Sequence, residues 1–313
     1  MSLLDERRTD GLVHEAFPHS TREEMLGFVV PFLREGLEAG DAVALACGEE
    51  TGDEIVEAVG DTRVSVLTRG FAMLRIPDAL AVARDSVRAG AGRRLRVVGG
   101  LDYGSAVSGR TDWMRLESLL NRELAPFPLW LVCALDTSSL PADVVGTTLS
   151  AHPLLREHGT TRPNPAYLET SALMTRLSPG DPDPLQERPP DVTVPGVRSL
   201  VDVGRVRHAV LTALPPGAHD LVACIDEVVT NALEHGRPPV DLQLWVAPDR
   251  RRAVCAVRDR GTGIADPTVG YSARHLADDP EARLGLRIVR RLCDRMDHEQ
   301  THDGFVVRLS SSW

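Results

Sequence analysis

Short apolar runs alternate with amphipathic segments along the first half of the chain. The apolar runs, typical of strands covered on both faces of a sheet, lie at 42–47, 64–68, 95–100 and 129–136. Apolar residues at helical spacing predict helices at 20–40, 51–59, 77–89, 111–124 and 141–150. Strands that alternate with helices in this way predict an α/β domain with a largely parallel sheet.

The pattern changes after a segment rich in proline. Residues 176–196, "RLSPGDPDPLQERPPDVTVPG", hold six prolines, which predict an extended linker between a first domain at 1–175 and a second at 197–313. In the second domain, an amphipathic helix ending near Gly236 precedes two alternating strands joined by "APDRR", which predict a hairpin. A glycine turn, a helix opening at Gly285 and a final strand follow, so we expect an α+β domain.

Composition narrows the possible functions. The net charge is −10, and all 35 positive residues are Arg, because the sequence contains no Lys. The absence of Lys excludes a Schiff-base enzyme and the lysine of a P-loop, and the acidic balance argues against nucleic acid as the main partner. The five cysteines show no metal-type spacing, and no apolar run is long enough to span a membrane. We expect a soluble cytoplasmic protein with buried, reduced thiols.

Polar side chains recur along one face of the helix in "CIDEVVTNALEHG". Glu227, Asn231 and His235 are spaced four residues apart, so they line up along that face. Alone, this pattern is more typical of a solvated surface. About 30 residues later, however, a strand runs into "DRGTG", where Asp259 precedes two glycines. A carboxylate can accept a hydrogen bond from the adenine amine, and glycines let backbone approach a ligand closely.

This order of motifs resembles the GHKL (Bergerat) ATP-binding fold of gyrase, Hsp90 and histidine kinases, over residues 197–313. It is closest to the short anti-sigma-factor serine kinases. The resemblance implies ATP and Mg²⁺ as cofactors, with Glu227 as the general base and Asn231 as a Mg²⁺ ligand. It further implies nucleotide contacts from a set of motif residues: His235, Asp259, Gly261, Gly263, Arg283, Gly285 and Leu286.

The first domain is similar to the MEDS sensory domain, which is related in layout to RecA-like ATPases. "HEAFPHSTREEMLGFVVPFLREGLEAGDAVALAC", "RLRVVGG" and "HPLLREHGTTRPNPAYLE" carry this resemblance, over about residues 12–170. It implies a sensory or docking module that binds a small-molecule signal. His14, His19 and Trp113 are candidate ligand contacts, although each is also typical of a structural residue. The carboxyl ends of the predicted strands, "CGEETG", "GGLDYGS" and "LDTSS", are the expected place for a ligand.

Two functions follow from the combined resemblance. In the first, the protein is an anti-sigma-like serine/threonine kinase that binds a sigma factor and phosphorylates an anti-anti-sigma partner of the STAS type. It would act as a homodimer under control of its sensory domain. In the second, it is a nucleotide- or ligand-regulated binding module without catalysis. Arg283 motivates this alternative, because it stands where the family's GxGL box has its first glycine. An enzyme centred on "GGLDYGS" is a third class, and it lacks a recognisable nucleophile–base pair.

A sensor histidine kinase fits the sequence less well. Such a kinase needs a helical hairpin with a phosphoacceptor histidine before its ATP-binding domain, and here that position holds the proline-rich segment. His208 lies within the second domain and is typical of a structural histidine.

Overall fold

A computed structural model of the 313-residue chain describes residues 11–67, 75–89, 93–100, 107–157, 159–180, 183–271 and 280–313. The chain divides into two compact units. The first comprises Met1–Leu74 and Asp78–Leu173, and the second comprises Arg75–Pro77 and Met174–Trp313. The described helices include none that is both long enough and apolar enough to cross a membrane.

The first unit is built on a sheet that, in its described part, has seven strands in the order β3-β2-β4-β5-β1-β6-β7. Only β7 runs antiparallel to its neighbour. The strands are β1 (Val13–His19), β2 (Ala42–Leu45), β3 (Ser65–Val66), β4 (Leu95–Gly99), β5 (Leu129–Asp136), β6 (Leu154–Glu157) and β7 (Thr160–Pro163). The prediction of a largely parallel α/β sheet is therefore confirmed.

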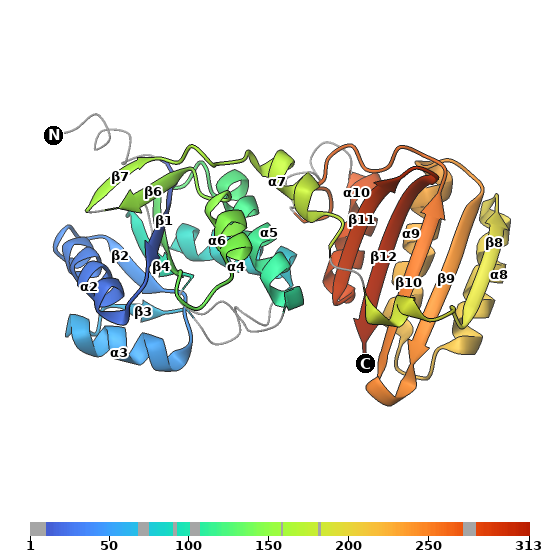
Figure 1. The fold of residues 1–313 in the computed structure, drawn as a ribbon, viewed down its shortest axis with the longest axis horizontal. Helices are drawn as coiled ribbons and strands as arrows, with labels where there is room; N and C mark the ends of the chain where they lie inside the picture. The colour runs from blue at the N-terminus through green and yellow to red at the C-terminus, as the bar shows by residue number, and fades with distance from the viewer. Residues whose placement is uncertain are drawn as a thin grey trace. The chain divides into compact units, whose positions relative to one another are not determined.

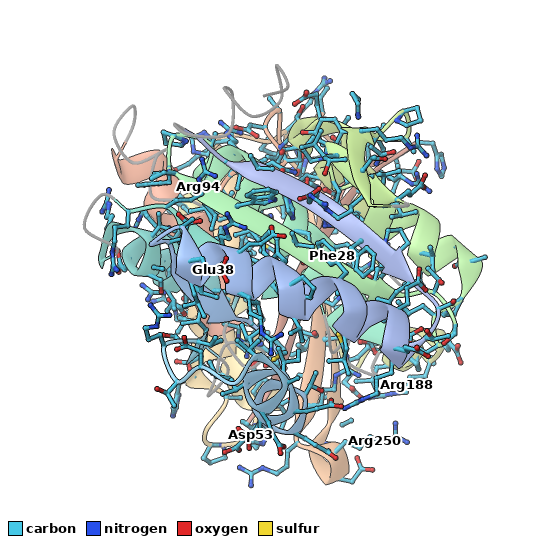
Figure 2. The ribbon with its side chains drawn as sticks, turned by 90° about the vertical axis from the view of Figure 1, so that its left-hand side faces the viewer. Phe28, Glu38, Asp53, Arg94, Arg188 and Arg250 are labelled. Atoms are coloured by element: carbon cyan, nitrogen blue, oxygen red, sulfur yellow. The ribbon has the colours of Figure 1, made fainter. Side chains whose placement is uncertain are left out.

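Helices cover both faces of this sheet. Their bounds are α2 (Arg22–Glu38), α3 (Glu49–Val59), α4 (Ile76–Ala89), α5 (Val107–Glu123) and α6 (Ala142–Leu149). A further helix, α7 (Thr170–Leu177), lies where the chain passes from the first unit to the second. Helix α2, capped by the Thr21 side chain, lies across one face, as Figure 2 shows around Phe28. Helices α4 and α5 lie on the opposite face (Figure 1), where their apolar side chains line a cavity against the sheet. All five helices predicted before residue 150 are present, within a few residues of their expected bounds.

One central strand of the first unit was not predicted. β1 lies between β5 and β6, with Ala16 opposite Cys133. Its sequence, "VHEAFPH", interrupts the apolar pattern with His14 and Glu15, yet both side chains are almost wholly buried. Glu15 accepts hydrogen bonds from Trp130, Arg156 and Thr161, which accounts for a buried carboxylate on this strand.

The second unit is an antiparallel sheet covered on one face by helices (Figure 1). The strand order is β11-β12-β10-β9-β8. The elements are β8 (Val192–Val197), α8 (Leu200–Ala213), α9 (His219–Glu234), β9 (Val240–Ala247), β10 (Arg252–Asp259), α10 (Pro280–Leu292), β11 (Arg295–Thr301) and β12 (Gly304–Ser312). The predicted hairpin is β9–β10, joined by a short 3-10 turn, η3 (Pro248–Arg250). The final strand rejoins the sheet between β10 and β11.

Apolar side chains of the three helices, such as Val206, Ile225 and Val289, form one core with the inner face of this sheet. On the opposite face, Leu185 from a 3-10 turn, η2 (Pro184–Glu187), packs against a small apolar cluster that contains Trp245. This turn lies in the segment predicted as an extended linker, and β8 begins within the same segment. Residues 183–197 thus form part of the second unit.

Candidate functional site

Glu227 and Asn231 stand one turn apart on the same face of α9. The Asn231 side-chain amide donates to Glu227 Oε1 at 2.7 Å and to the Glu227 backbone carbonyl at 2.9 Å. Because Nδ2 is used in this way, Asn231 Oδ1 faces away from Glu227, and within the described residues it accepts no hydrogen bond. Glu227 Oε2 likewise has no partner among these residues. The pair therefore offers two oxygens to a ligand.

Helix α10 approaches this pair at Gly285. A Cβ atom on Gly285 would lie 1.6 Å from Glu227 Oε1, so only glycine allows the two helices to meet here. The expectation that a helix opens at Gly285 is wrong, because α10 begins at Pro280. Gly285 therefore sits inside the helix, where its backbone N–H is already committed to helical hydrogen bonding. Its role in this structure is to bring α10 against the Glu227 carboxylate.

Asp259 ends β10 with one carboxylate oxygen held and the other available. Oδ1 accepts hydrogen bonds from the backbone N–H groups of Gly261, at 2.5 Å, and Arg237, at 3.2 Å. Oδ2 accepts none from the described part of the chain. The side chain is 5% exposed. Two fixed donors hold the carboxylate in one orientation and leave Oδ2 for a ligand that donates a hydrogen bond.

Three glycines crowd around Asp259, and each excludes a side chain. On Gly236, a Cβ atom would lie 2.7 Å from Asp259 Cγ, and on Gly261 it would lie 2.7 Å from Asp259 Oδ1. On Gly304, it would lie 2.0 Å from the backbone carbonyl oxygen of Asp259. Gly236 was expected to cap the end of α9. Instead the helix ends at Glu234 with His235 as its cap, in a right-handed conformation, and close packing against Asp259 explains the glycine. Gly304, at φ +133°, was not predicted, although the "DG" turn before the last strand marks it.

The remaining motif residues occupy different environments. Gly263, at φ +80°, lies against the Phe305 ring, and His235 is exposed at the end of α9. Leu286 is buried in the apolar core beneath α10. Arg283 belongs to α10, but its side chain lies outside the described residues, as does the segment 272–279 between the glycine turn and α10.

Helix α9 connects the two groups of polar side chains. Glu227 and Asn231 lie in its body, whereas Gly236, immediately after its end, contacts Asp259. Glu227 and Asn231 lie nine and five residues before Gly236, which correspond to about 13 Å and about 8 Å along a helix axis. A ligand that places a hydrogen-bond donor at Asp259 and a metal-bound anionic group at Asn231 would therefore have to be elongated.

The three candidate ligand contacts of the first unit, His14, His19 and Trp113, occupy different places in it. His14 is buried between the sheet and α5, and His19 ends β1 at the carboxyl edge, where burial lowers its pKa. Trp113 lines a cavity of about 70 Å³ between the sheet and helices α4 and α5. Of the three strand ends expected to hold a ligand, "GGLDYGS" lies mostly outside the described residues.

Comparisons with known proteins identify both parts of the chain. Residues 13–153 match the family model of the MEDS domain, described as the methanogen/methylotroph, DcmR sensory domain. Residues 198–311 match the model of the histidine kinase-like ATPase domain. No curated protein matches the chain. A solved structure, "ATPase Domain of G40P", is 10% identical, covers 47% of this chain and 68% of its own, and has a TM-score of 0.33, at which the likeness supports no conclusion.

Proposed function

Because the chain joins a MEDS sensory domain to a histidine kinase-like ATPase domain, we propose that it is a regulatory ATP-binding protein of the anti-sigma-factor type. In this role it transfers a phosphoryl group to a serine or threonine of a STAS-type anti-anti-sigma partner. The observation that carries the proposal is the pair formed by Glu227 and Asn231, whose free oxygens share one face of α9.

The residues present fit ATP and Mg²⁺. Asp259 Oδ2 is oriented by the two bonds to Oδ1 and can accept from the adenine amine, which is a hydrogen-bond donor. Asn231 Oδ1 is a hard oxygen ligand of the kind that Mg²⁺ takes in small numbers beside phosphates and water. Gly261 lets the backbone after β10 turn close enough to Asp259 to donate to its Oδ1, which helps to fix the carboxylate for such a contact.

Bound ATP supplies the phosphoryl group, and Glu227 supplies a base for the acceptor. Its Oε2 can accept the proton of a serine or threonine hydroxyl, while the hydrogen bond from Asn231 to Oε1 holds the carboxylate in place. Proton transfer to a positioned carboxylate typically contributes about 10²- to 10⁴-fold to a rate. Asn231 thereby serves both Glu227 and the metal.

The partners are proposed from the family resemblance. A sigma factor would be held when the STAS partner is phosphorylated, and a small molecule bound by the MEDS domain would set the rate of transfer. We propose a homodimer as the working form. The alternative is a binding module that uses nucleotide only to select its partner, which is favoured by Arg283 in place of a glycine in the "RLGL" segment.

The decisive experiment separates nucleotide binding from transfer. The full chain is incubated with [γ-³²P]ATP, Mg²⁺ and a panel of STAS-domain proteins, and ATP affinity is measured by calorimetry. We expect Glu227→Gln to bind ATP within a few-fold of wild type and to transfer phosphate about 10²- to 10⁴-fold more slowly. Glu234→Gln, at the exposed end of the same helix, is the matched control and should leave both quantities unchanged.

Two outcomes would redirect the proposal. In the first, ATP binds with measurable heat, no partner becomes labelled, and Glu227→Gln matches wild type in both measurements. This result would favour the non-catalytic binding module. In the second, neither ATP nor ADP gives any heat of binding. This result would exclude nucleotide binding from the proposed function.

A further inference from the structure

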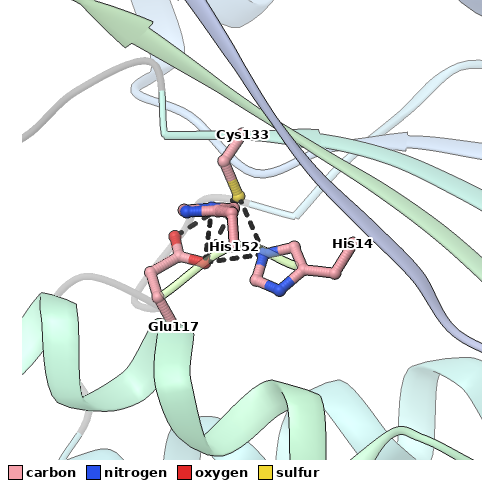
Figure 3. A group of neighbouring side chains, drawn as sticks. All are labelled: His14, Glu117, Cys133 and His152. Carbon is pink, nitrogen blue, oxygen red and sulfur yellow. Dashed lines mark hydrogen bonds and ion pairs between the residues drawn. The ribbon is translucent and has the colours of Figure 1, made fainter. Parts of the chain in front are cut away.

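Four side chains capable of binding a metal meet inside the first unit (Figure 3). They come from separate elements: His14 from β1, Glu117 from α5, Cys133 from β5, and His152 from the segment after α6. Each residue is at most 2% exposed. One ligand atom from each can be chosen so that all four lie within 4.8 Å of one another.

The outer nitrogens of both imidazole rings are already engaged. His14 Nδ1 lies 2.8 Å from Asn121 Oδ1, and Asn121 is oriented by its own donation to the Ala151 carbonyl at 2.7 Å. Because Asn121 presents an acceptor, His14 Nδ1 must carry the proton. His152 Nδ1 lies 2.9 Å from the Thr148 carbonyl and must also donate.

With Nδ1 of each ring bound outward, the inner nitrogen, Nε2, faces the cluster. His14 Nε2 lies 3.1 Å from Glu117 Oε2 and 3.4 Å from Cys133 Sγ. His152 Nε2 is fully buried and has no hydrogen-bond partner in the described structure. Two imidazole nitrogens, a thiol and a carboxylate thus face one another, and each of them can bind a metal. Buried polar atoms of this kind are unfavourable without a partner, and a cation among them would supply one to His152 Nε2.

The spacing of the ligand atoms suits one particular class of ion. Zinc–ligand bonds of about 2.0–2.3 Å at tetrahedral angles place neighbouring ligand atoms about 3.3–3.8 Å apart. In the cluster, Cys133 Sγ lies 3.3 Å from Glu117 Oε2, and His152 Nε2 lies 3.7 Å from the same oxygen. A thiolate and a carboxylate would also balance the charge of a divalent ion, which leaves the buried site neutral.

We propose that His14, Glu117, Cys133 and His152 form a closed, four-coordinate site for a divalent transition metal of the zinc type. Mixed nitrogen, sulfur and oxygen ligands in a tetrahedral set are typical of Zn²⁺. The bonds from His14 to Asn121 and from His152 to Thr148 are the outer interactions that orient histidine ligands. With all four positions filled by the protein, the ion ties β1, β5, α5 and the end of α6 together.

The test uses the full chain without an affinity tag. Metal content is measured by elemental analysis, and the apoprotein is titrated with Co²⁺, whose absorption reports both tetrahedral geometry and a thiolate ligand. We expect one equivalent of metal per chain and a thiolate-to-cobalt charge-transfer band. Cys133→Ser should abolish that band, whereas Cys47→Ser, which changes a buried thiol of the same unit outside the cluster, should retain it.

A second variant keeps the proposal testable if Cys133→Ser fails to fold. Asn121→Leu leaves all four ligands in place but removes the acceptor for His14 Nδ1. We expect its metal affinity to fall about 10- to 100-fold while the charge-transfer band persists. The proposal is overturned if folded wild type binds neither Zn²⁺ nor Co²⁺ stoichiometrically. It is equally overturned if the band survives Cys133→Ser but is lost on Cys293→Ser in the second unit.

Discussion

The two units each gather polar side chains, but they do so in opposite ways. In the second unit, Glu227 and Asp259 each have one carboxylate oxygen bound within the protein and one without a partner among the described residues. Asn231 donates through Nδ2 and leaves Oδ1, and both Glu227 and Asn231 are only half-buried. In the first unit, His14, Glu117, Cys133 and His152 face one another, and each is almost completely buried.

This difference distinguishes a site for an exchanging ligand from a site for a resident one. A nucleotide at the proposed site would have to enter and leave, and the half-buried Glu227 and Asn231 suit such an exchange. An ion enclosed by four buried side chains becomes part of the core, and its binding energy contributes to folding. The comparison predicts separate responses of the two units to their ligands.

The largest expected effect is selective protection by ligand. At a free Zn²⁺ concentration 100 times its dissociation constant, the metal should stabilise the first unit by about 2.7 kcal/mol, and a chelator should reverse this gain. ATP with Mg²⁺ should protect the second unit alone. Hydrogen exchange followed by mass spectrometry, read on peptides of β5 and α9, measures both effects. Equal protection of both units by either ligand would contradict the separation.

The next effect concerns the oriented carboxylate of the nucleotide site. Asp259→Asn places an amide where the adenine amine needs an acceptor, and removes a charge-assisted bond of about 1.5–3 kcal/mol. We therefore expect ATP affinity to fall by roughly 10- to 150-fold in calorimetry. Asp249→Asn, in the exposed turn between β9 and β10, is the control and should bind ATP as wild type does. If Asp259→Asn binds ATP with the affinity of wild type, Asp259 does not contact the adenine amine.

The smallest expected effect tests the contact between α9 and α10. Gly285→Ala inserts a methyl group 1.6 Å from Glu227 Oε1, and we expect a loss of about 1 kcal/mol, at the low end for overpacking, because the carboxylate can turn aside. Gly204→Ala in α8 meets no atom within 4 Å and should instead raise stability by up to about 1 kcal/mol through helix propensity. Denaturant unfolding of the two variants measures the change in the free energy of unfolding of each. A change of the same sign in both variants would refute the contact between α9 and α10.

Much of the fold follows from local pattern in the sequence. The continuous apolar runs of β2, β4 and β5 and the amphipathic helices between them are each specified by their own residues. β1 is different because His14 and Glu15 interrupt its apolar pattern, and their burial depends on partners more than a hundred residues away. A strand whose polar residues are satisfied only by tertiary contacts cannot be recognised from hydrophobic periodicity.

The same contrast separates the two sites. Glu227 and Asn231 lie four residues apart on one helix, and Asp259 adjoins its own glycines, so short motifs were enough to single them out as candidates. The four residues of the proposed metal site lie at positions 14, 117, 133 and 152, with no recurring spacing. The cysteines accordingly show no metal-type pattern in the sequence. Parallel pairing of β1 with β5 brings His14 and Cys133 together, and only the fold contains that information.

The packing of η2 has a practical consequence for dividing the chain. Asp183 pairs with Arg252, the Arg188 carbonyl accepts from the Trp245 indole, and Asp191 accepts from the Val246 backbone. A fragment that starts at residue 198, where the family match begins, would lack β8 and these three contacts. It would expose Trp245 and a sheet edge open to pairing with other chains. An expression fragment of the ATPase domain should therefore begin before residue 183, and shorter versions are expected to aggregate.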